Sequence, residues 1–410
     1  SDLSNVKLCW ELQVEGKKVQ SGEIDKLDID PQQTKEFTLP YNVETIIDGE
    51  PLLNVYFKLK SAEPLMEMGQ IVAYRQLGDD VDYGVTDSFE ILDEKLSIKA
   101  KNTDKEFSLS GAKFAINFDK ITGFISKYEY DGKNVLGEGG TIKPNFWRAV
   151  TDNDMGANLQ NKLSVWRNPK MDLKDFKVQK QDDGYLISTY YDMPDVKAEL
   201  LLCYYVYNKG VVELLENMNV QDSVNKPDMP RFGVVIQLPY DMDKSEFYGR
   251  GPIENYNDRC ESQLVGIYKQ TADEQSYPYI RPQETGSKTG IRWWKQITNN
   301  GFGIFVSENV AMQAAVEIAA GNDEVSDSLN TNTFTASALH YDVATLDEGI
   351  IKHQRHIQQL PKSKYTNLFI DGEMSGVGGI DSWSGNAQAL PKYRVLYGNK
   401  SLIFTISPLK

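Results

Sequence analysis

Apolar residues alternate with polar ones at the start of the chain, with a period of two residues. Residues 6–14, VKLCWELQV, are the clearest case, and residues 53–59 and 70–77 repeat the pattern. Because successive side chains of a strand point to opposite faces, this alternation predicts half-buried strands. With a turn predicted at Glu15-Gly16, short strands of this kind over residues 1–80 indicate a small β-sandwich of immunoglobulin type.

The same alternation returns after a polar interruption. Residues 81–105 are polar and acidic and alternate less regularly, so we place a linker there. Over residues 106–410 the period of two recurs in a series of stretches, and Asp131-Gly132 between two of them is a hairpin turn signal. We therefore expect a long second domain built of antiparallel strands.

Helical signals are few. Residues 161–168 are compatible with one helical turn, and residues 308–321 are ambiguous because their alanine content competes with apolar alternation. The sequence shows no dinucleotide-binding glycine fingerprint, no P-loop and no internal repeat of fixed period. The predicted fold class is all-β.

Composition narrows the classes of function. The 410-residue chain is long enough for more than one domain, and its 40% hydrophobic and 11% aromatic content is that of a folded protein. A net charge of −15 opposes binding to nucleic acid or to an anionic membrane, and no apolar run suggests a membrane span. We expect a soluble protein, and its three cysteines leave the cytoplasm and the periplasm equally open.

A first polar cluster lies in NFWRAVTDNDMG, at residues 145–156. Its candidate side chains are Arg148, Asp152, Asn153 and Asp154. Closely spaced carboxylates could bind Ca²⁺ or hydrogen-bond sugar hydroxyls. Alternatively, these side chains cap the loop's own backbone while the arginine pairs with one carboxylate, and we favour this structural interpretation.

A second cluster, YGRGPIENYNDR at residues 248–259, combines glycines with a proline. It predicts a tight bend with a positive φ at a glycine. Arg250, Glu254 and Arg259 are candidate partners for sugar hydroxyls. Alternatively the segment is a corner tied down by Asp258 and Arg259, and we favour this second interpretation.

Two histidines, His353 and His356, lie three positions apart. On a helix they would share a face and suit a metal, whereas in a strand an offset of three points them to opposite faces. The sequence shows no third ligand near them, so we expect no metal site in this chain.

The stretch GGIDSWSG, residues 378–385, places a bulky indole in a glycine-rich turn. Trp383 follows Asp381 and Ser382, and an indole face suits the C–H side of a pyranose ring. The alternative is a Trp folded back as a plug over one end of the sandwich. The residue pattern leaves both interpretations open.

Glycoside hydrolysis needs two positioned carboxyl groups, one acting as proton donor and one as nucleophile or base. The sequence has 59 acidic residues but no evident pair of this kind. It also lacks the Asn-Glu dipeptide that marks the acid/base in many barrel glycosidases. We expect no catalytic residue in this chain.

These stretches together resemble the carboxyl-terminal part of a β-galactosidase of glycoside hydrolase family two. SAEPLMEMGQIVAYRQL, at residues 61–77, is similar to the end of the immunoglobulin-like domain that follows the family's catalytic barrel. FWRAVTDNDMG, YGRGPIENYNDR, YIRPQETG and GGIDSWS look like successive landmarks of the family's last domain, in the family's order.

The resemblance implies an immunoglobulin-like domain followed by a large antiparallel supersandwich of the galactose mutarotase type. It also implies that the barrel with the catalytic glutamates and the Mg²⁺ and Na⁺ sites lies outside this chain, which would be inactive alone. For the complete protein it implies retaining hydrolysis of terminal β-galactosides of the lactose type, in a homo-oligomer.

In the family, a Trp of the last domain closes the galactoside site in the barrel, and GGIDSW aligns it with Trp383. Asp381 and Ser382 are weaker candidates, because the family usually has a second Asp where this chain has Ile380.

Two rival functions remain. A free-standing mutarotase-like enzyme would need an acid and a base, commonly His with Glu, facing one sugar pocket. A noncatalytic carbohydrate-binding module or scaffold would need no such pair of residues.

Overall fold

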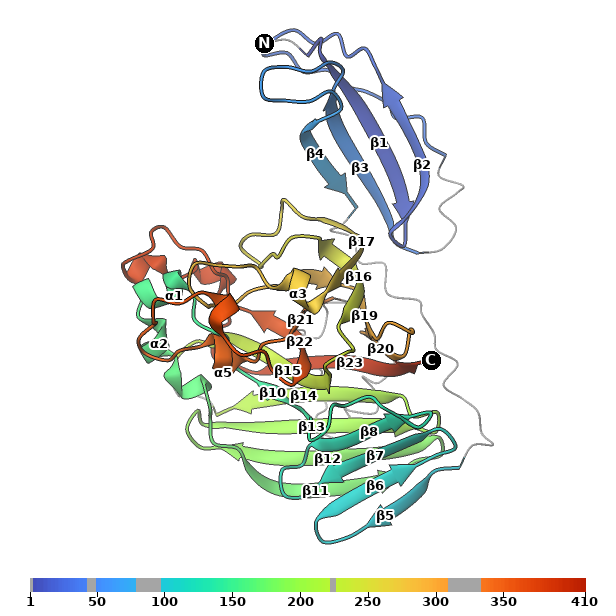
Figure 1. Cartoon of the computed structure of the whole chain (residues 1–410), viewed down its shortest axis with the longest axis vertical. Coiled ribbons are helices and arrows are strands. Elements are labelled where there is room, and N and C mark those ends of the chain that lie inside the picture. Colours follow the sequence, from blue (N-terminus) through green and yellow to red (C-terminus); the bar gives the residue numbers. More distant parts are fainter. Residues whose placement is uncertain (1–2, 43–48, 79–96, 222–225, 309–332) are drawn as a thin grey trace. The chain divides into compact units, whose positions relative to one another are not determined.

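The structure is a computed structural model that describes residues 3–42, 49–78, 97–221, 226–308 and 333–410. Strands and loops make up most of this part of the chain, as Figure 1 shows, so the expected all-β class is confirmed. The chain divides into two compact units. The first is Ser1–Asp87 with Leu264–Ile267, and the second is Ser88–Gln263 with Tyr268–Lys410.

The first unit contains, in its described part, a four-stranded antiparallel sheet in the order β2-β1-β3-β4. Its strands are β1 (Val6–Val14), β2 (Lys17–Ile24), β3 (Pro51–Leu59) and β4 (Ile71–Leu77). The predicted turn at Glu15-Gly16 joins the first two, and both of its residues have a positive φ. The three strands predicted from alternation are therefore present.

One face of this sheet is buried. Leu8, Trp10 and Leu12 alternate along β1 and are each no more than 6% exposed. They form a core cluster with Leu27, from the segment 25–42 that follows β2 without regular strand structure. In the described residues, the second layer of the expected sandwich is thus an irregular segment rather than a sheet.

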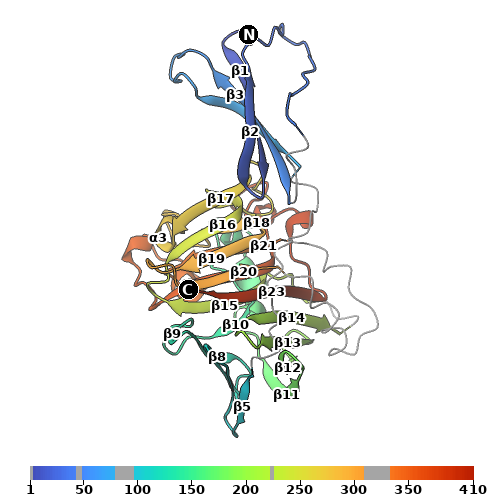
Figure 2. The same cartoon turned by 90° about the vertical axis from the view of Figure 1, so that its right-hand side faces the viewer.

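The second unit is built on two large antiparallel sheets. In the described residues, a ten-stranded sheet runs β18-β21-β22-β15-β10-β8-β7-β6-β5, with β9 paired to β8. A nine-stranded sheet runs β11-β12-β13-β14-β23-β20-β19-β16-β17, and Figure 2 shows these nine strands following one another in that order. The strands of the ten-stranded sheet are β5 (Lys99–Asn102), β6 (Glu106–Ser110), β7 (Phe114–Asp119), β8 (Ile125–Tyr130), β9 (Lys133–Asn134), β10 (Ile142–Asn145), β15 (Arg231–Pro239), β18 (Lys288–Ile291), β21 (Phe334–Leu339) and β22 (Tyr365–Met374). Those of the nine-stranded sheet are β11 (Asp172–Lys180), β12 (Gly184–Met193), β13 (Ala198–Tyr207), β14 (Val212–Val220), β16 (Lys244–Gly251), β17 (Leu264–Thr271), β19 (Trp293–Ile297), β20 (Gly303–Ser307) and β23 (Lys400–Leu409).

A single large core cluster draws on both sheets. Phe118 and Phe232 belong to the ten-stranded sheet, Tyr204 and Phe404 to the nine-stranded one, and all four are fully buried members of this cluster. Phe118 and Tyr204 are in edge contact, with ring centroids 5.2 Å apart. Burial of one face of each sheet against the other produces the expected supersandwich.

Helices are short. Those in the described residues are α1 (Asp152–Gly156), α2 (Leu159–Lys162), α3 (Ala272–Gln275) and α5 (Val343–Leu346), with the 3-10 turns η2 (Ser164–Trp166), η5 (Ile357–Gln359), η6 (Gly385–Ala387) and η7 (Pro391–Tyr393). The helical turn considered for residues 161–168 is present as the end of α2 and η2. The ambiguous stretch 308–321 lies, apart from its first residue, outside the described residues. None of the helices in the described part is long and apolar enough to cross a membrane.

The carboxyl end of the expected linker is a strand. Residues 81–96 of the segment 81–105 lie outside the described residues, but residues 99–102 form β5 at the edge of the ten-stranded sheet. All four residues of β5 are exposed. An edge strand with both faces in solvent shows no alternation of apolar and polar residues, so the sequence pattern could not reveal it.

The positive φ expected at a glycine of residues 248–259 is wrong. Gly249 and Gly251 both lie in β16, and neither is among the residues with a positive φ. A Cβ on Gly249 would lie 2.4 Å from Ile291 Cδ1 and 2.9 Å from Gly290 O. This glycine therefore permits close packing of strands, not a turn.

Candidate functional site

The stretch with Trp383 forms the loop between β22 and η6. Its indole is 80% exposed, and the apolar side chain of Ile380 in the same loop is 77% exposed. Trp383 is thus not folded back as a plug over the described residues. The sequence left open which interpretation holds, and the geometry places the indole at the surface.

Asp381 fixes the backbone of this loop. Its Oδ1 accepts hydrogen bonds from Trp383 N at 3.1 Å and from Ser384 N at 3.0 Å, and its Oδ2 accepts one from Ser384 Oγ at 2.6 Å. The hydrogen bond from the Ser384 hydroxyl is the main reason that the pKa of Asp381 lies below its usual value. The carboxylate therefore orders the turn that presents the indole.

Helix α1 lies directly against this loop. A Cβ on Gly156, at the end of α1, would lie 2.3 Å from Ser382 O and 3.0 Å from Trp383 Cα. Only a residue without a side chain fits there. The candidate loop at residues 152–156 and the Trp383 loop are therefore brought together.

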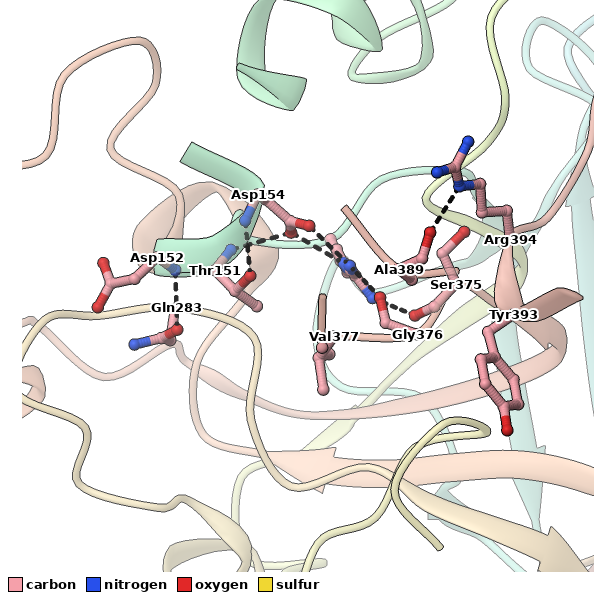
Figure 3. A network of polar contacts seen from close by, with 12 residues as sticks. Thr151, Asp152, Asp154, Gln283, Ser375, Gly376, Val377, Ala389, Tyr393 and Arg394 are labelled. Carbon is pink, nitrogen blue, oxygen red and sulfur yellow. Dashed lines mark hydrogen bonds and ion pairs between the residues drawn. The ribbon is translucent and has the colours of Figure 1, made fainter. Parts of the chain in front are cut away.

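Arg148 ties α1 to the end of β22. It is 2% exposed, and its Nη2 donates to Asp154 Oδ1 and to Gly376 O, both at 2.9 Å. Its Nη1 donates to Ser375 O. Figure 3 shows Asp154 on one side of this network and Ser375 and Gly376 on the other. Arg148 therefore pairs with one carboxylate, Asp154, and with two backbone carbonyls.

Asp154 also caps the amino-terminal end of α1. Its Oδ2 accepts from Thr151 N at 3.0 Å, while Thr151 Oγ1 accepts from Asp154 N at 3.0 Å, which is a reciprocal capping box. Asp152, at the first position of α1, turns the other way and accepts from Arg281 Nη2 at 2.6 Å. Asn153 is half-buried on the same helix, and its carbonyl accepts from Ala157 N at 3.0 Å.

The segment 248–259 holds the Trp383 loop from another side. Asp258 Oδ1 accepts from Val377 N at 3.1 Å and its Oδ2 accepts from Gly378 N at 2.7 Å. Asn257 Nδ2 donates to Met374 O at 3.0 Å. Asp258 therefore ties down the glycine-rich turn, whereas the sequence pattern predicts this role for it only within the corner of its own segment.

The other polar residues of this segment have structural partners. Glu254 Oε1 accepts from Arg259 Nη2 at 2.8 Å, and its Oε2 accepts from Gly286 N at 2.8 Å and from Thr285 Oγ1 at 3.1 Å. Arg250 Nη1 donates to Gln263 O at 3.1 Å. Glu254 thus links the segment to YIRPQETG, and Arg281 of YIRPQETG donates to Asp152 of the first cluster.

The second unit also contains a buried ionic cluster that the sequence pattern does not predict. Arg231 Nε donates to Asp371 Oδ1 at 2.8 Å, and its Nη1 lies 3.6 Å from Glu284 Oε2. Burial raises the pKa of Glu284 to about 7. The sequence signal for this cluster is a charged residue at the edge of or within an apolar stretch, as in RFGVVIQL and LFIDG. Such a residue indicates that a buried ion pair is present, but it does not say which residue is the partner.

The carboxylates around the Trp383 loop thus serve backbone or arginine partners. Asp154, Asp258 and Asp381 each accept hydrogen bonds from backbone N–H groups of the site. Among the described residues, no group of three His, Cys, Asp or Glu side chains is placed to hold a metal ion. What the site offers a ligand is an exposed indole on a rigidly held turn.

Two family models match the chain. Residues 110–406 match the beta galactosidase small chain model, and residues 1–78 match the model of domain 4 of beta-galactosidase. A β-galactosidase of Priestia megaterium is 28% identical over 100% of this chain and 36% of its own length. One of Lactobacillus delbrueckii subsp. bulgaricus is 26% identical over 91% of this chain and 33% of its own length.

The chain thus spans about a third of the length of the curated relatives it matches. Among solved structures, a galactose 1-epimerase from Lactobacillus acidophilus covers 77% of this chain and 98% of its own, with a TM-score of 0.38 and 10% identity. Since the small chain model accounts for residues 110–406, well over half of the sequence, the chain belongs to the beta galactosidase small chain family.

Proposed function

We propose that this chain is the carboxyl-terminal portion of a retaining β-galactosidase, and that Trp383 closes the galactoside site on a catalytic barrel that the chain does not contain. In this proposal the portion supports the barrel and performs no bond making itself. The relatives named β-galactosidase support the assignment to a larger hydrolase, because the chain matches only about a third of their length.

The exposed indole is the observation that supports the role of Trp383. An isolated protein gains by covering so large an apolar side chain, yet this one is 80% exposed beside the 77% exposed Ile380. Asp381, Asp258 and the Gly156 contact hold its backbone in place. A fixed, uncovered aromatic surface suits a ligand or domain that arrives from outside this chain.

The expected effect of Trp383 is on binding. An indole stacked on the C–H face of galactose contributes in the ground state and in the transition state alike, so its loss raises KM more than it lowers kcat. Trp383→Ala in the complete enzyme should raise KM for nitrophenyl β-galactoside by roughly 5- to 150-fold, the equivalent of about 1–3 kcal/mol. Trp383→Phe should retain part of the affinity.

A matched control separates this role from general surface effects. Ile121→Ala removes another large apolar side chain, 71% exposed, from the turn between β7 and β8. It should leave KM at the wild-type value. An unchanged KM in Trp383→Ala would refute the role of the indole.

The chain alone provides a second test. Incubated with nitrophenyl β-galactoside, Mg²⁺ and Na⁺, it should show no hydrolysis above a mock-purified control, because the proposal places both catalytic carboxylates outside it. Turnover that copurifies with the chain would mean that a carboxylate pair of this chain is catalytic. That result would overturn the proposed division of labour.

A further inference from the structure

A cavity of about 470 Å³ lies on one face of the ten-stranded sheet. Its floor comes from three neighbouring strands, with Asn145 on β10, Gln237 on β15 and Asn367 on β22. The residues next to the last two, Ile236 and Leu368, belong to the core cluster, so the cavity lies on the opposite face of the sheet. Its volume is in the range of small-molecule sites.

The walls come from the loops that follow β10 and β21. The aromatic side chains that line the cavity are Phe124, Phe146, Trp147, Trp166 and Phe369. None of Trp383, Asp381 and Ser382 lines it. The cavity is therefore distinct from the Trp383 loop.

Asn367 is the reason to expect a ligand. Its side chain is fully buried, and neither its Oδ1 nor its Nδ2 has a hydrogen-bond partner among the described residues. Nδ2 of Asn145, on the same floor, also lacks a partner in the described part of the chain. Buried amides are almost always satisfied in folded proteins, by protein, water or a bound molecule.

The charged groups of the cavity neutralise one another. Asp347 Oδ2 accepts from Trp147 Nε1 at 2.7 Å and lies 3.2 Å from Arg167 Nη2. The guanidinium of Arg167 lies over the Trp147 ring, 4.9 Å from its centroid. Asp342 Oδ1 accepts from Thr345 N at 2.7 Å at the start of α5. Lys143 also lines the cavity, so two carboxylates are matched by two cations and neither charge is in excess for an ion.

The remaining polar capacity is that of side-chain amides and of Arg167, whose Nε and Nη2 have no hydrogen-bond partner in the described part of the chain. An amide both donates and accepts, which matches a hydroxyl group, and the aromatic walls match the C–H surfaces of a sugar ring. We propose that this cavity binds a neutral mono- or disaccharide, with hydroxyls hydrogen-bonded to Asn145, Gln237 and Asn367. This is a noncatalytic sugar site additional to the galactoside site to which we assign Trp383.

The test is a titration of this chain, which lacks the barrel and its galactoside site. Galactose, glucose and lactose are added separately, and binding is followed by saturation-transfer NMR and by tryptophan fluorescence, since Trp147 and Trp166 line the cavity. At least one neutral sugar should bind saturably. Asn367→Leu, which keeps the side chain's size but removes its amide, should weaken that binding about tenfold or more.

Two further variants keep the result interpretable. Thermal unfolding shows whether Asn367→Leu is folded. If it is not, Gln237→Leu, which alters the half-buried neighbour of Asn367, provides the same test and should also weaken binding. Gln358→Leu removes an exposed amide on η5 and should bind sugar as the wild type does. In Trp383→Ala the response should persist, because Trp383 does not line the cavity.

Several outcomes would overturn the proposal. One is the absence of saturable binding by all three sugars, which would mean that water alone satisfies the amides. Undiminished binding in folded Asn367→Leu and Gln237→Leu is another, and so is saturable binding of inorganic phosphate with no response to sugars. None of these would touch the role of Trp383, which is read from KM in the complete enzyme.

Discussion

The buried pair of Arg148 and Asp154 is the most informative place to perturb the site. Their side chains are 3% and 7% exposed, and they lie 2.9 Å apart. Arg148→Met would leave the Asp154 carboxylate buried without its counter-charge and the carbonyls of Ser375 and Gly376 without a donor. Removing one partner of such a pair typically costs about 3–5 kcal/mol of folding free energy.

The reverse change leads to the same loss. Asp154→Asn would leave the Arg148 guanidinium buried without a counter-charge and should also cost about 3–5 kcal/mol. In the double variant neither charge is left unpaired, so its cost should be smaller than the sum of the two single costs by about 1–3 kcal/mol. The assay is urea unfolding of the chain, followed by tryptophan fluorescence.

A surface pair serves as the control. Lys127 and Glu129 lie 3.0 Å apart on β8 with side chains 46% and 32% exposed, and Lys127→Met should change stability by less than about 1 kcal/mol. The reasoning about Arg148 fails if its replacement costs no more than that of Lys127, or if the costs of the Arg148 and Asp154 changes simply add.

Three further changes test other parts of the site and the core. Gly156→Ala places a Cβ 2.3 Å from Ser382 O; it should cost roughly 1–3 kcal/mol in unfolding experiments and raise KM in the complete enzyme by displacing the Trp383 loop. Asp258→Ala frees the N–H groups of Val377 and Gly378, so KM should rise with little change in kcat, whereas an unchanged KM would show that the loop holds without it. Burial lowers the pKa of Lys288 from 10.5 to about 7. Between these pH values the unfolded chain holds more protons than the folded one, so the free energy of unfolding should rise from pH 7 toward pH 10.5. In urea titrations, Lys288→Met should remove up to about 1.4 kcal/mol per pH unit of that rise.

The period of two predicted strands most clearly where one face is buried. Strand β4 was also predicted, although Gln76 is its only buried residue. The alternation of Leu8, Trp10 and Leu12 reappears as alternating burial in β1. The hairpin signal Asp131-Gly132 is confirmed, since both residues have the positive φ that such a turn needs. Where both faces are exposed, as in β5, the same rule has nothing to detect.

The candidate site was only partly predictable. The sequence indicated that Arg148 pairs with a carboxylate, but it could not choose between Asp152 and Asp154. The choice depends on the capping box, which turns Asp154 inward, and on Arg281, which holds Asp152 from 129 residues away. Sequence spacing carries no information about contacts at such separations, whereas the glycines around Trp383 were visible as a local signal.

The pairing of β23 has a consequence for how the protein is made. Residues 400–409 lie between β14 and β20, so that Glu213 pairs with Thr405. Until the ribosome has synthesised β23, β14 and β20 each have an unpaired edge, and the nine-stranded sheet consists of two separate parts. Pairings so distant along the chain form slowly, and unpaired edges recruit strands from other molecules. Nascent chains stalled before residue 400 should therefore depend on chaperones far more than the finished protein.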